Sequence, residues 1–264
     1  MKPISLGTVH LVGSGPGDPE LLTVKAHRLL GQTDVVLHDD LVPAAILALA
    51  GPQAEVINVG KRCGAKGITQ GEIDALMIDF ARRGLDVVRL KSGDPGIFGR
   101  LAEEIDALSA AEVPFDVVPG ITAGLGAAAS LGVSLTDRRK SARVVIVTGH
   151  HAQKAARQQK PDWKNLAQGN ATLVIYMPGH DFASLREEFL AAGLADNIPA
   201  AIVSHASTPR QQHQYTTIRD MDKLPRLDSP TILLVGRVLE DARLRAGGNP
   251  LLALDEASLI LSSR

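Results

Sequence analysis

The sequence predicts an α/β protein built from two domains. Short apolar runs of the kind that form buried strands alternate with amphipathic segments of helical period through most of the 264 residues. A polar, basic stretch at residues 136–141 interrupts this alternation near the middle of the chain. A chain of this length can fill one large core or two smaller ones, and the interruption favours two.

The first half of the chain alternates regularly between strands and helices, which favours a mainly parallel sheet covered by helices on both faces. Thr69 followed by Glu72 is a capping box that predicts the start of one helix, and Gly84 predicts its end. The expected strands are residues 9–12, 34–38, 55–59, 86–91 and 115–118, and the expected helices are residues 21–30, 43–50, 70–83 and 101–111.

The second half repeats this pattern less regularly. Residues 214–218 are expected to form an antiparallel or edge strand, because the connections on either side lack a clear helical pattern. The other expected strands are residues 143–149, 172–177, 200–203 and 231–236, with a helix that ends at residue 192. The predicted domains are residues 1–138 and 142–244, followed by a tail at 245–264.

A loop rich in glycine and proline joins the first strand to the first helix. Gly13, Gly15 and Gly17 allow the backbone positive φ angles or a close approach to a bound molecule, while Pro16 and Pro19 restrict the loop to few conformations. This combination is typical of a loop that contacts a ligand.

Three interpretations of this loop compete. A phosphate-binding P-loop needs Gly-Lys-Ser/Thr where this chain has Asp18-Pro19-Glu20, whose carboxylates would repel phosphate. A dinucleotide-binding fingerprint needs a third glycine where Asp18 stands. The third interpretation is a tight turn with no ligand, which the loop alone does not exclude.

Several polar or flexible groups share one position, just past the carboxyl end of a predicted strand. In open parallel sheets this is the edge where ligands bind. The sequence therefore predicts one cleft lined by the glycine-rich loop, Asp39, Lys61, Gly93-Asp94 and Thr122.

The composition narrows the class of protein. The formal net charge is −1 and aromatic residues make up 3%, which argues against a nucleic-acid partner. The chain shows no signal-peptide pattern and no apolar run long enough for a membrane helix, so we expect a cytoplasmic protein with no membrane partner. Cys63 is the single cysteine and the histidines lack clustered partners, so no metal site is assigned.

Sequence blocks at these strand ends carry a resemblance to a known family. They are Val12-Gly13-Ser14-Gly15-Pro16-Gly17-Asp18, Asp39-x-Leu41-Val42, Val59-Gly60-Lys61-Arg62, Arg89-Leu90-Lys91-Ser92-Gly93-Asp94-Pro95, Phe98-Gly99-Arg100 with Glu103-Glu104, Pro119-Gly120-Ile121-Thr122-Ala123, Thr148-Gly149-His150 and Tyr176-Met177. From about Val9 to Val238, the chain resembles the S-adenosylmethionine-dependent tetrapyrrole methylases, most specifically those that act on uroporphyrinogen III.

The resemblance implies methylation of uroporphyrinogen III at two ring carbons, giving precorrin-2. It implies two α/β domains with S-adenosylmethionine in the cleft between them, in a homodimer. Asp39 and Lys61 match the family's proposed proton acceptor and donor, and Arg100 and Glu103 match positions that handle the substrate. The positions that match the family's cofactor contacts are Pro16, Ser92, Gly93, Asp94, Ile97, Thr122, Ala123, Met177, Ala206 and Thr231.

The chemistry agrees with the resemblance. A sulfonium carries an activated methyl group, so the protein needs mainly to align the attacking carbon and remove a proton. A substrate with many carboxylates needs local cations. Those in or beside the cleft loops are Lys61, Arg62, Arg89, Lys91, Arg100, Arg138, Arg139 and Lys140.

The chain departs from the family pattern at His38, Ser92, Asp137 and Ser204-His205-Ala206-Ser207. Asp137 is the departure that bears on substrate, since it adds a negative charge near a polyanion. The alternatives for function are a methylase of a later precorrin, a nicotinamide-dependent reductase and a tetrapyrrole-binding module without catalysis. Structural roles are the alternatives for individual residues: Asp39 as a helix cap, Asp94 as a turn residue and Met177 as core filler.

Overall fold

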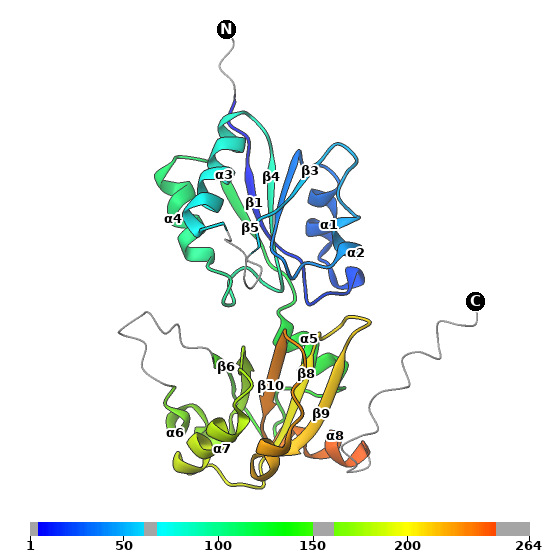
Figure 1. The fold of residues 1–264 in the computed structure, drawn as a ribbon, viewed down its shortest axis with the longest axis vertical. Helices are drawn as coiled ribbons and strands as arrows, with labels where there is room; N and C mark the ends of the chain where they lie inside the picture. The colour runs from blue at the N-terminus through cyan, green and yellow to red at the C-terminus, as the bar shows by residue number, and fades with distance from the viewer. Residues whose placement is uncertain (1–4, 61–67, 150–160, 247–264) are drawn as a thin grey trace, which may run out of the picture. The chain divides into compact units, whose positions relative to one another are not determined.

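The computed structural model describes residues 5–60, 68–149 and 161–246 (Figure 1). Contacts divide the chain into two units, Met1–Ala123 and Gly124–Arg264. This division falls earlier in the chain than the boundary at 139–141 that the sequence suggests, because α5 (Ala123–Ser130) packs on the second sheet. Each unit has its own five-stranded sheet.

The first sheet is wholly parallel, as the alternation of strands and helices predicts. Its order is β3-β2-β4-β1-β5, and every neighbouring pair runs in the same direction. The strands are β1 (Val9–Gly13), β2 (Val35–His38), β3 (Glu55–Asn58), β4 (Val87–Lys91) and β5 (Phe115–Val118).

The helices of the first unit follow local sequence signals. Thr69 and Glu72 form the predicted capping box, and the helix that they begin ends at Arg82. The first helix is shorter than predicted, because Thr23 caps it and a separate turn of 3₁₀ helix precedes it. The elements are η1 (Pro19–Leu21), α1 (Val24–Leu30), α2 (Ala44–Leu47), α3 (Gln70–Arg82) and α4 (Leu101–Ala110).

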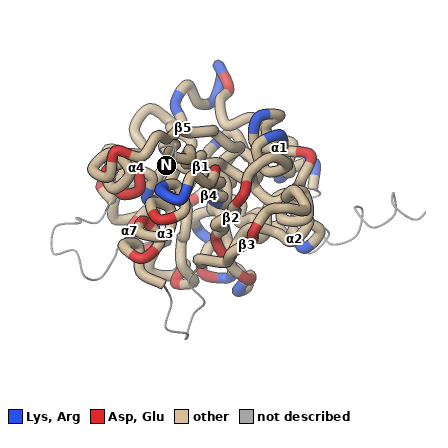
Figure 2. The backbone as a smooth tube through the Cα atoms, turned by 90° about the horizontal axis from the view of Figure 1, so that it is seen from above, with Lys and Arg blue, Asp and Glu red and all other residues tan. Residues whose placement is uncertain are grey.

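These helices cover both faces of the first sheet (Figure 1). Leu11 and Leu37 face α3 and α4, whereas Val12 and Val36 face α1 and α2. The alternation follows from the two-residue period of a strand, and strands buried on both faces read as continuous apolar runs. Acidic and basic residues are interspersed along the chain in the view of Figure 2.

The second sheet is mixed, in the order β6-β7-β10-β8-β9. The pair β6 and β7 is parallel, while β10 runs antiparallel to both of its neighbours. The edge strand predicted at 214–218 is confirmed as antiparallel, although it begins at Gln212. The strands are β6 (Val144–Thr148), β7 (Thr172–Tyr176), β8 (Pro199–Ser204), β9 (Gln212–Thr217) and β10 (Thr231–Val235).

Apolar side chains of α6, α7 and η3 pack on one face of the second sheet. Within this core the rings of Trp163 and Phe189 meet edge to face, with centroids 4.9 Å apart. On the other face, Gly124 of α5 donates its backbone N–H to the Tyr176 hydroxyl at 2.7 Å. The remaining elements are α6 (Trp163–Leu166), η2 (Gln168–Asn170), α7 (Phe182–Ala191), η3 (Ile218–Lys223), η4 (Arg237–Leu239) and α8 (Glu240–Arg245). Of the predicted tail, residues 247–264 lie outside the described ranges.

Candidate functional site

The carboxyl ends of the first unit's strands meet at one edge of the sheet. The register pairs Gly13 with Lys91 at the ends of β1 and β4, and His38 with Asn58 at the ends of β2 and β3. The loop after β1 carries Pro16, that after β2 carries Asp39, and that after β4 carries Ser92, Gly93, Asp94 and Ile97; Thr122 and Ala123 follow β5. The structure therefore brings these predicted residues to a common edge. Lys61 lies outside the described residues.

The loops after β1, β4 and β5 are held together by their backbones. Gly15 and Gly93 exchange hydrogen bonds, with N···O distances of 3.1 and 2.8 Å. A Cβ atom added to Gly120 would lie 2.2 Å from the carbonyl oxygen of Gly93, so only glycine permits this approach. The three loops form one rim made largely of backbone and small side chains, which suits close contact with a ligand.

Asp94 joins two of these loops. Its Oδ2 accepts the backbone N–H of Gly120 at 3.0 Å, and its Oδ1 accepts the N–H of Gly96 at 2.8 Å. The second bond is the local turn that the Asp-Pro pair suggests. Since each carboxylate oxygen can accept more than one hydrogen bond, these contacts leave acceptor capacity for a ligand.

The turn before α4 has an unusual backbone. Phe98 and Arg100 have positive φ angles of 55° and 58°, a region that non-glycine residues seldom occupy. Arg100 is the N-cap of α4, and its Nε donates to Glu103 Oε1 at 2.8 Å. This hydrogen bond raises the pKa of Arg100 and lowers that of Glu103. Both predicted substrate-handling residues are thus half-exposed, charged and paired with each other.

Asp39 is one end of a chain of ionic contacts. Its Oδ1 accepts a hydrogen bond from Arg89 Nη2 at 2.5 Å, and its side chain is 32% exposed. It does not cap the following helix, because the N-cap residue of α2 is Pro43 and that position has no side-chain hydrogen bond. The alternative of Asp39 as a helix cap is therefore wrong.

Behind Arg89 lie two further charges. Glu104 Oε1 accepts from Arg89 Nε at 3.0 Å and from Lys91 Nζ at 2.8 Å. Burial, with a contribution from neighbouring Arg89, lowers the pKa of Lys91. Arg89 and Lys91 are only 2% exposed, so the prediction that they meet substrate carboxylates is wrong. Two cations at alternate positions of a doubly buried strand are the sequence signal that could have revealed this arrangement, because each needs a buried partner.

The three cofactor contacts expected in the second unit also share one edge, that of the second sheet. Met177 follows the end of β7, Ala206 follows the end of β8, and Thr231 begins the antiparallel strand β10, where it pairs with Ser204. Met177 is 47% exposed and has a φ of 48°, so the alternative of Met177 as core filler is wrong. His205 and Ser207, on either side of Ala206, have φ angles of 48° and 61°. Strained backbone of this kind is concentrated at ligand-binding sites.

The charge of Asp137 is compensated within its own turn. Asp137 accepts hydrogen bonds from the backbone N–H and the guanidinium of Arg139, which lower its pKa to about 2. Lys140 pairs with Asp241 at 2.9 Å, whereas Arg138 is exposed. Pairing with Arg139 therefore weakens the repulsion that Asp137 would exert on an anionic substrate. Arg62, like Lys61, lies outside the described residues.

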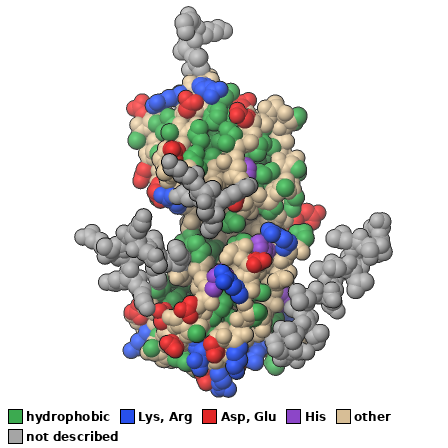
Figure 3. Space-filling model, in the orientation of Figure 1, with side chains coloured by type: hydrophobic (Ala, Val, Ile, Leu, Met, Phe, Trp, Pro, Cys, Tyr) green, Lys and Arg blue, Asp and Glu red, His purple; other side chains and the backbone are tan. Residues whose placement is uncertain are grey.

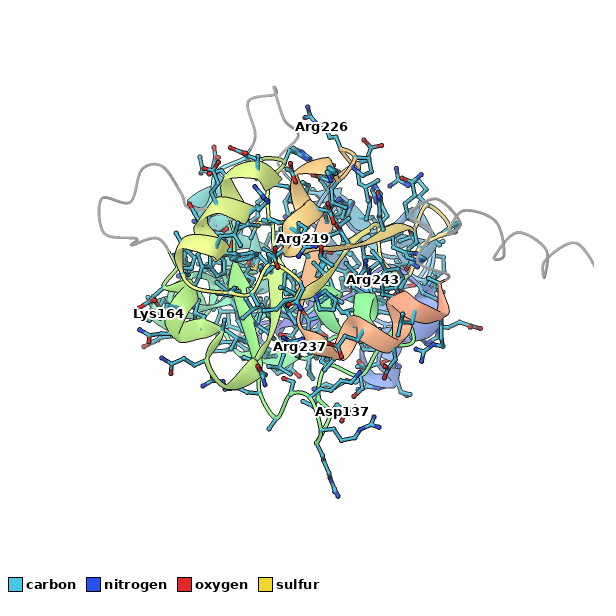
Figure 4. The ribbon with its side chains drawn as sticks, turned by 90° about the horizontal axis from the view of Figure 1, so that it is seen from below. Asp137, Lys164, Arg219, Arg226, Arg237 and Arg243 are labelled. Carbon is cyan, nitrogen blue, oxygen red and sulfur yellow. The ribbon has the colours of Figure 1, made fainter. Side chains whose placement is uncertain are left out.

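Basic residues also gather at one end of the second unit, where acidic side chains lie among them (Figure 3). Figure 4 looks onto this end and labels Lys164, Arg219, Arg226, Arg237 and Arg243, which come from separate segments. Arg219 pairs with Asp196 at 2.9 Å and Arg237 with Glu240 at 3.0 Å. A cavity of about 420 Å³ lined by Lys164 and Arg237 lies here, at the end of β7 opposite to Met177.

Among the described residues, no cluster of three or more His, Cys, Asp or Glu side chains is arranged to hold a metal ion. In the same part of the chain, no helix combines the length and apolar character needed to cross a membrane.

The chain belongs to the tetrapyrrole (corrin/porphyrin) methylase family, whose model matches residues 8–222. It is 44% identical over 237 residues to a uroporphyrinogen-III C-methyltransferase of Paracoccus denitrificans, a match that covers 88% of this chain and 82% of that protein. A crystal structure of uroporphyrin-III C-methyltransferase from Thermus thermophilus, complexed with S-adenosyl homocysteine, has a similar fold. Its TM-score is 0.77 at 37% identity, covering 89% of this chain and 100% of that one. The resemblance drawn from the motifs is confirmed.

In a longer relative, the matched region covers a smaller share of that protein. The chain is 42% identical over 241 residues to a siroheme synthase of Actinobacillus pleuropneumoniae. That match covers 89% of this chain but 48% of the relative, so the chain spans about half the length of that protein.

Proposed function

We propose that this chain transfers methyl groups from S-adenosylmethionine to two ring carbons of uroporphyrinogen III, giving precorrin-2 by way of precorrin-1. The proposal places the chain in the synthesis of sirohaem and cobalamin-type tetrapyrroles. Its main support is the 44% identity to a uroporphyrinogen-III C-methyltransferase along most of both chains. The glycine-rich rim at the strand ends and the contact between Asp39 and Arg89 are the structural features that support the proposal.

The residues present suit the methyl donor. The loops after β1, β4 and β5 offer backbone groups and small side chains, with the exposed Met177 and the strained turn around Ala206 in the second unit. In this proposal the first unit holds the donor with Pro16, Ser92, Gly93, Asp94, Ile97, Thr122 and Ala123, and the second with Met177, Ala206 and Thr231. When bound, S-adenosylmethionine supplies a methyl group that is already activated on a sulfonium.

The protein's own part in the reaction is alignment and removal of a proton. As the new carbon–carbon bond forms, the sulfur–methyl bond breaks and the ring system loses a proton. Asp39 is the proposed proton acceptor, because it matches the family's proposed acceptor position and lies partly exposed just past the end of β2. Lys61 is the proposed proton donor, and Arg100 and Glu103, which pair with each other, are the residues proposed to handle the substrate. We also propose that the protein is cytoplasmic and forms a homodimer.

The test is anaerobic incubation of the purified protein with uroporphyrinogen III and S-adenosylmethionine, followed by mass spectrometry of the tetrapyrrole. A gain of two methyl groups is expected. A protein that binds S-adenosylmethionine but transfers methyl groups only to an already methylated precorrin would refute the proposed substrate. If Asp39→Asn and Lys61→Met left turnover unchanged, the proposed roles of these residues would be wrong.

A further inference from the structure

Asp39, Arg89, Glu104 and Lys91 form a chain of ion pairs, called the ionic chain below, and three of these charged side chains are buried in the core. The side chains of Arg89 and Lys91 are each 3% exposed and that of Glu104 is fully buried. Placing charges in a core costs free energy, and replacing a buried ionic cluster by apolar residues of similar volume is often neutral or stabilising. Stability alone therefore does not explain why these charges are present.

The hydrogen bonds connect Glu104 in the core, through Arg89, to Asp39 at the edge of the sheet. Glu104 Oε1 accepts hydrogen bonds from Arg89 Nε at 3.0 Å, Lys91 Nζ at 2.8 Å and Gln70 Nε2 at 3.4 Å. The far end of the Arg89 guanidinium reaches Asp39 Oδ1 at 2.5 Å. Arg89 Nη1 also donates to the carbonyl oxygens of Leu37 and Leu90, each at 3.3 Å. The guanidinium is fixed on both sides, and Asp39 is the one member of the ionic chain with substantial exposure.

One oxygen of the Glu104 carboxylate accepts no hydrogen bond from the described residues. This atom, Oε2, is buried, so the contacts of the carboxylate are concentrated on Oε1. Within the group, two cations face two carboxylates and the formal charges cancel. Removing the charge of Glu104 would leave Arg89 and Lys91 with Asp39 as the remaining carboxylate of the group.

We propose that Glu104 is a positioning residue for methyl transfer: it orients Arg89, which in turn holds the Asp39 carboxylate in one direction at the sheet edge. The inference rests on the proposed function, in which Asp39 accepts the proton. Glu104 acts entirely through Arg89, since it is buried and Asp39 is the group at the surface. Misplacing a reacting group by about 1 Å can reduce turnover about 100-fold, so such a support is expected to affect rate.

The test compares Glu104→Gln with the unchanged protein and with Asp106→Asn, which alters an exposed carboxylate on the same helix. We expect Glu104→Gln to lower kcat about 10- to 100-fold. The KM for uroporphyrinogen III and the Kd for S-adenosylmethionine, measured by calorimetry, should stay within about twofold, because Glu104 is placed to touch neither ligand. Asp106→Asn should leave kcat unchanged. An equal loss of ligand binding in Glu104→Gln would contradict the proposal.

A double-mutant cycle separates positioning from general damage. In an Asp39→Asn background, Glu104→Gln should cause almost no further loss of kcat, because its route to the reaction has already been removed. A full additional loss would show that Glu104 does not act through Asp39.

Because Glu104→Gln can fail to fold, a second variant replaces Arg89, Lys91 and Glu104 together by methionine. It should fold with similar stability and still lose turnover; retained turnover would overturn the proposal.

A structural readout does not depend on turnover. Crystal structures of the unchanged protein and of Glu104→Gln should show the Arg89–Asp39 contact in the first and its loss or rotation in the second. An unchanged contact would refute the positioning role. If the unchanged protein does not methylate uroporphyrinogen III, the proposed function fails, and these two structures still decide whether Glu104 orients Asp39.

Discussion

Asp94 and Gly120, 26 residues apart in the sequence, are joined by a hydrogen bond of 3.0 Å from the glycine N–H to the aspartate Oδ2. With its other oxygen on Gly96 N–H, this single carboxylate fixes the loops after both β4 and β5. Asp94 is one of the cofactor contacts proposed above, and its hydrogen bonds shape the rim in which the cofactor is proposed to lie.

Asp94→Ala should therefore affect both stability and binding. It leaves two backbone N–H groups without their carboxylate, which should lower the free energy of unfolding by about 1–3 kcal/mol. The Kd for S-adenosylmethionine should rise about tenfold or more, as expected for one lost hydrogen bond to a charged group. Urea unfolding and calorimetry measure these effects. Asp106→Ala, at an exposed position on α4, should change neither; unchanged binding in Asp94→Ala would contradict a role in the site.

Gly120→Ala should destabilise the first unit by about 1–3 kcal/mol, because the added Cβ would meet the backbone carbonyl of Gly93 at 2.2 Å. Gly71 in α3 provides the matched comparison, since a Cβ there has no heavy atom within 4 Å. Gly71→Ala should be neutral or stabilise by up to about 1 kcal/mol, as alanine favours a helix. Equal effects of the two changes on the denaturation midpoint would show that the close approach of the loops is unimportant.

The carboxyl group of Asp137 should have an unusually low pKa. Hydrogen bonds from Arg139 lower its pKa to about 2 in the folded protein, compared with about 3.9 in an unfolded chain. Because the folded pKa is the lower one, this carboxylate contributes stability above about pH 4 that is lost as the pH falls towards 2. NMR titration of the side-chain carboxyl measures the midpoint. Arg139→Ala should raise that midpoint towards the ordinary value, and no change would mean that the pair does not exist in solution.

Arg100→Ala should weaken binding of the tetrapyrrole more than that of the methyl donor. Arg100 is 47% exposed in its pair with Glu103, so the guanidinium can turn from this partner to a substrate carboxylate. We expect the KM for uroporphyrinogen III to rise about tenfold, the effect of one charge-assisted contact, with the Kd for S-adenosylmethionine nearly constant.

A similar surface pair serves as the control for Arg100. Arg83 Nη1 and Asp79 Oδ2 lie 3.5 Å apart at the C-terminal end of α3, so Arg83→Ala should leave both constants unchanged. If Arg100→Ala behaves like Arg83→Ala in steady-state kinetics, Arg100 has no part in holding the substrate.

Much of the first unit could be predicted from the sequence, because its signals are local. The capping box at Thr69 and Glu72, the glycine-rich turn after β1 and the short apolar strands act over a few residues. The alternation of these strands with helices correctly indicated a parallel sheet, and with it the common edge that carries Asp39, Asp94 and Thr122.

The second unit and the charged core depended on long-range contacts. The sequence located β10 but not its antiparallel direction, which follows from its pairing with β7 and β8. Arg89 and Lys91 resembled cations available for substrate, yet both are buried with Glu104, which lies 15 positions beyond Arg89.

The sequence by itself thus determined the order of the elements, the strand-end loops and the family motifs, since short-range propensity and spacing specify them. Only the tertiary structure decided which charges are buried with one another and which remain at the surface. That outcome depends on strand order and on the helix that covers each face, and these bring together side chains far apart in the chain.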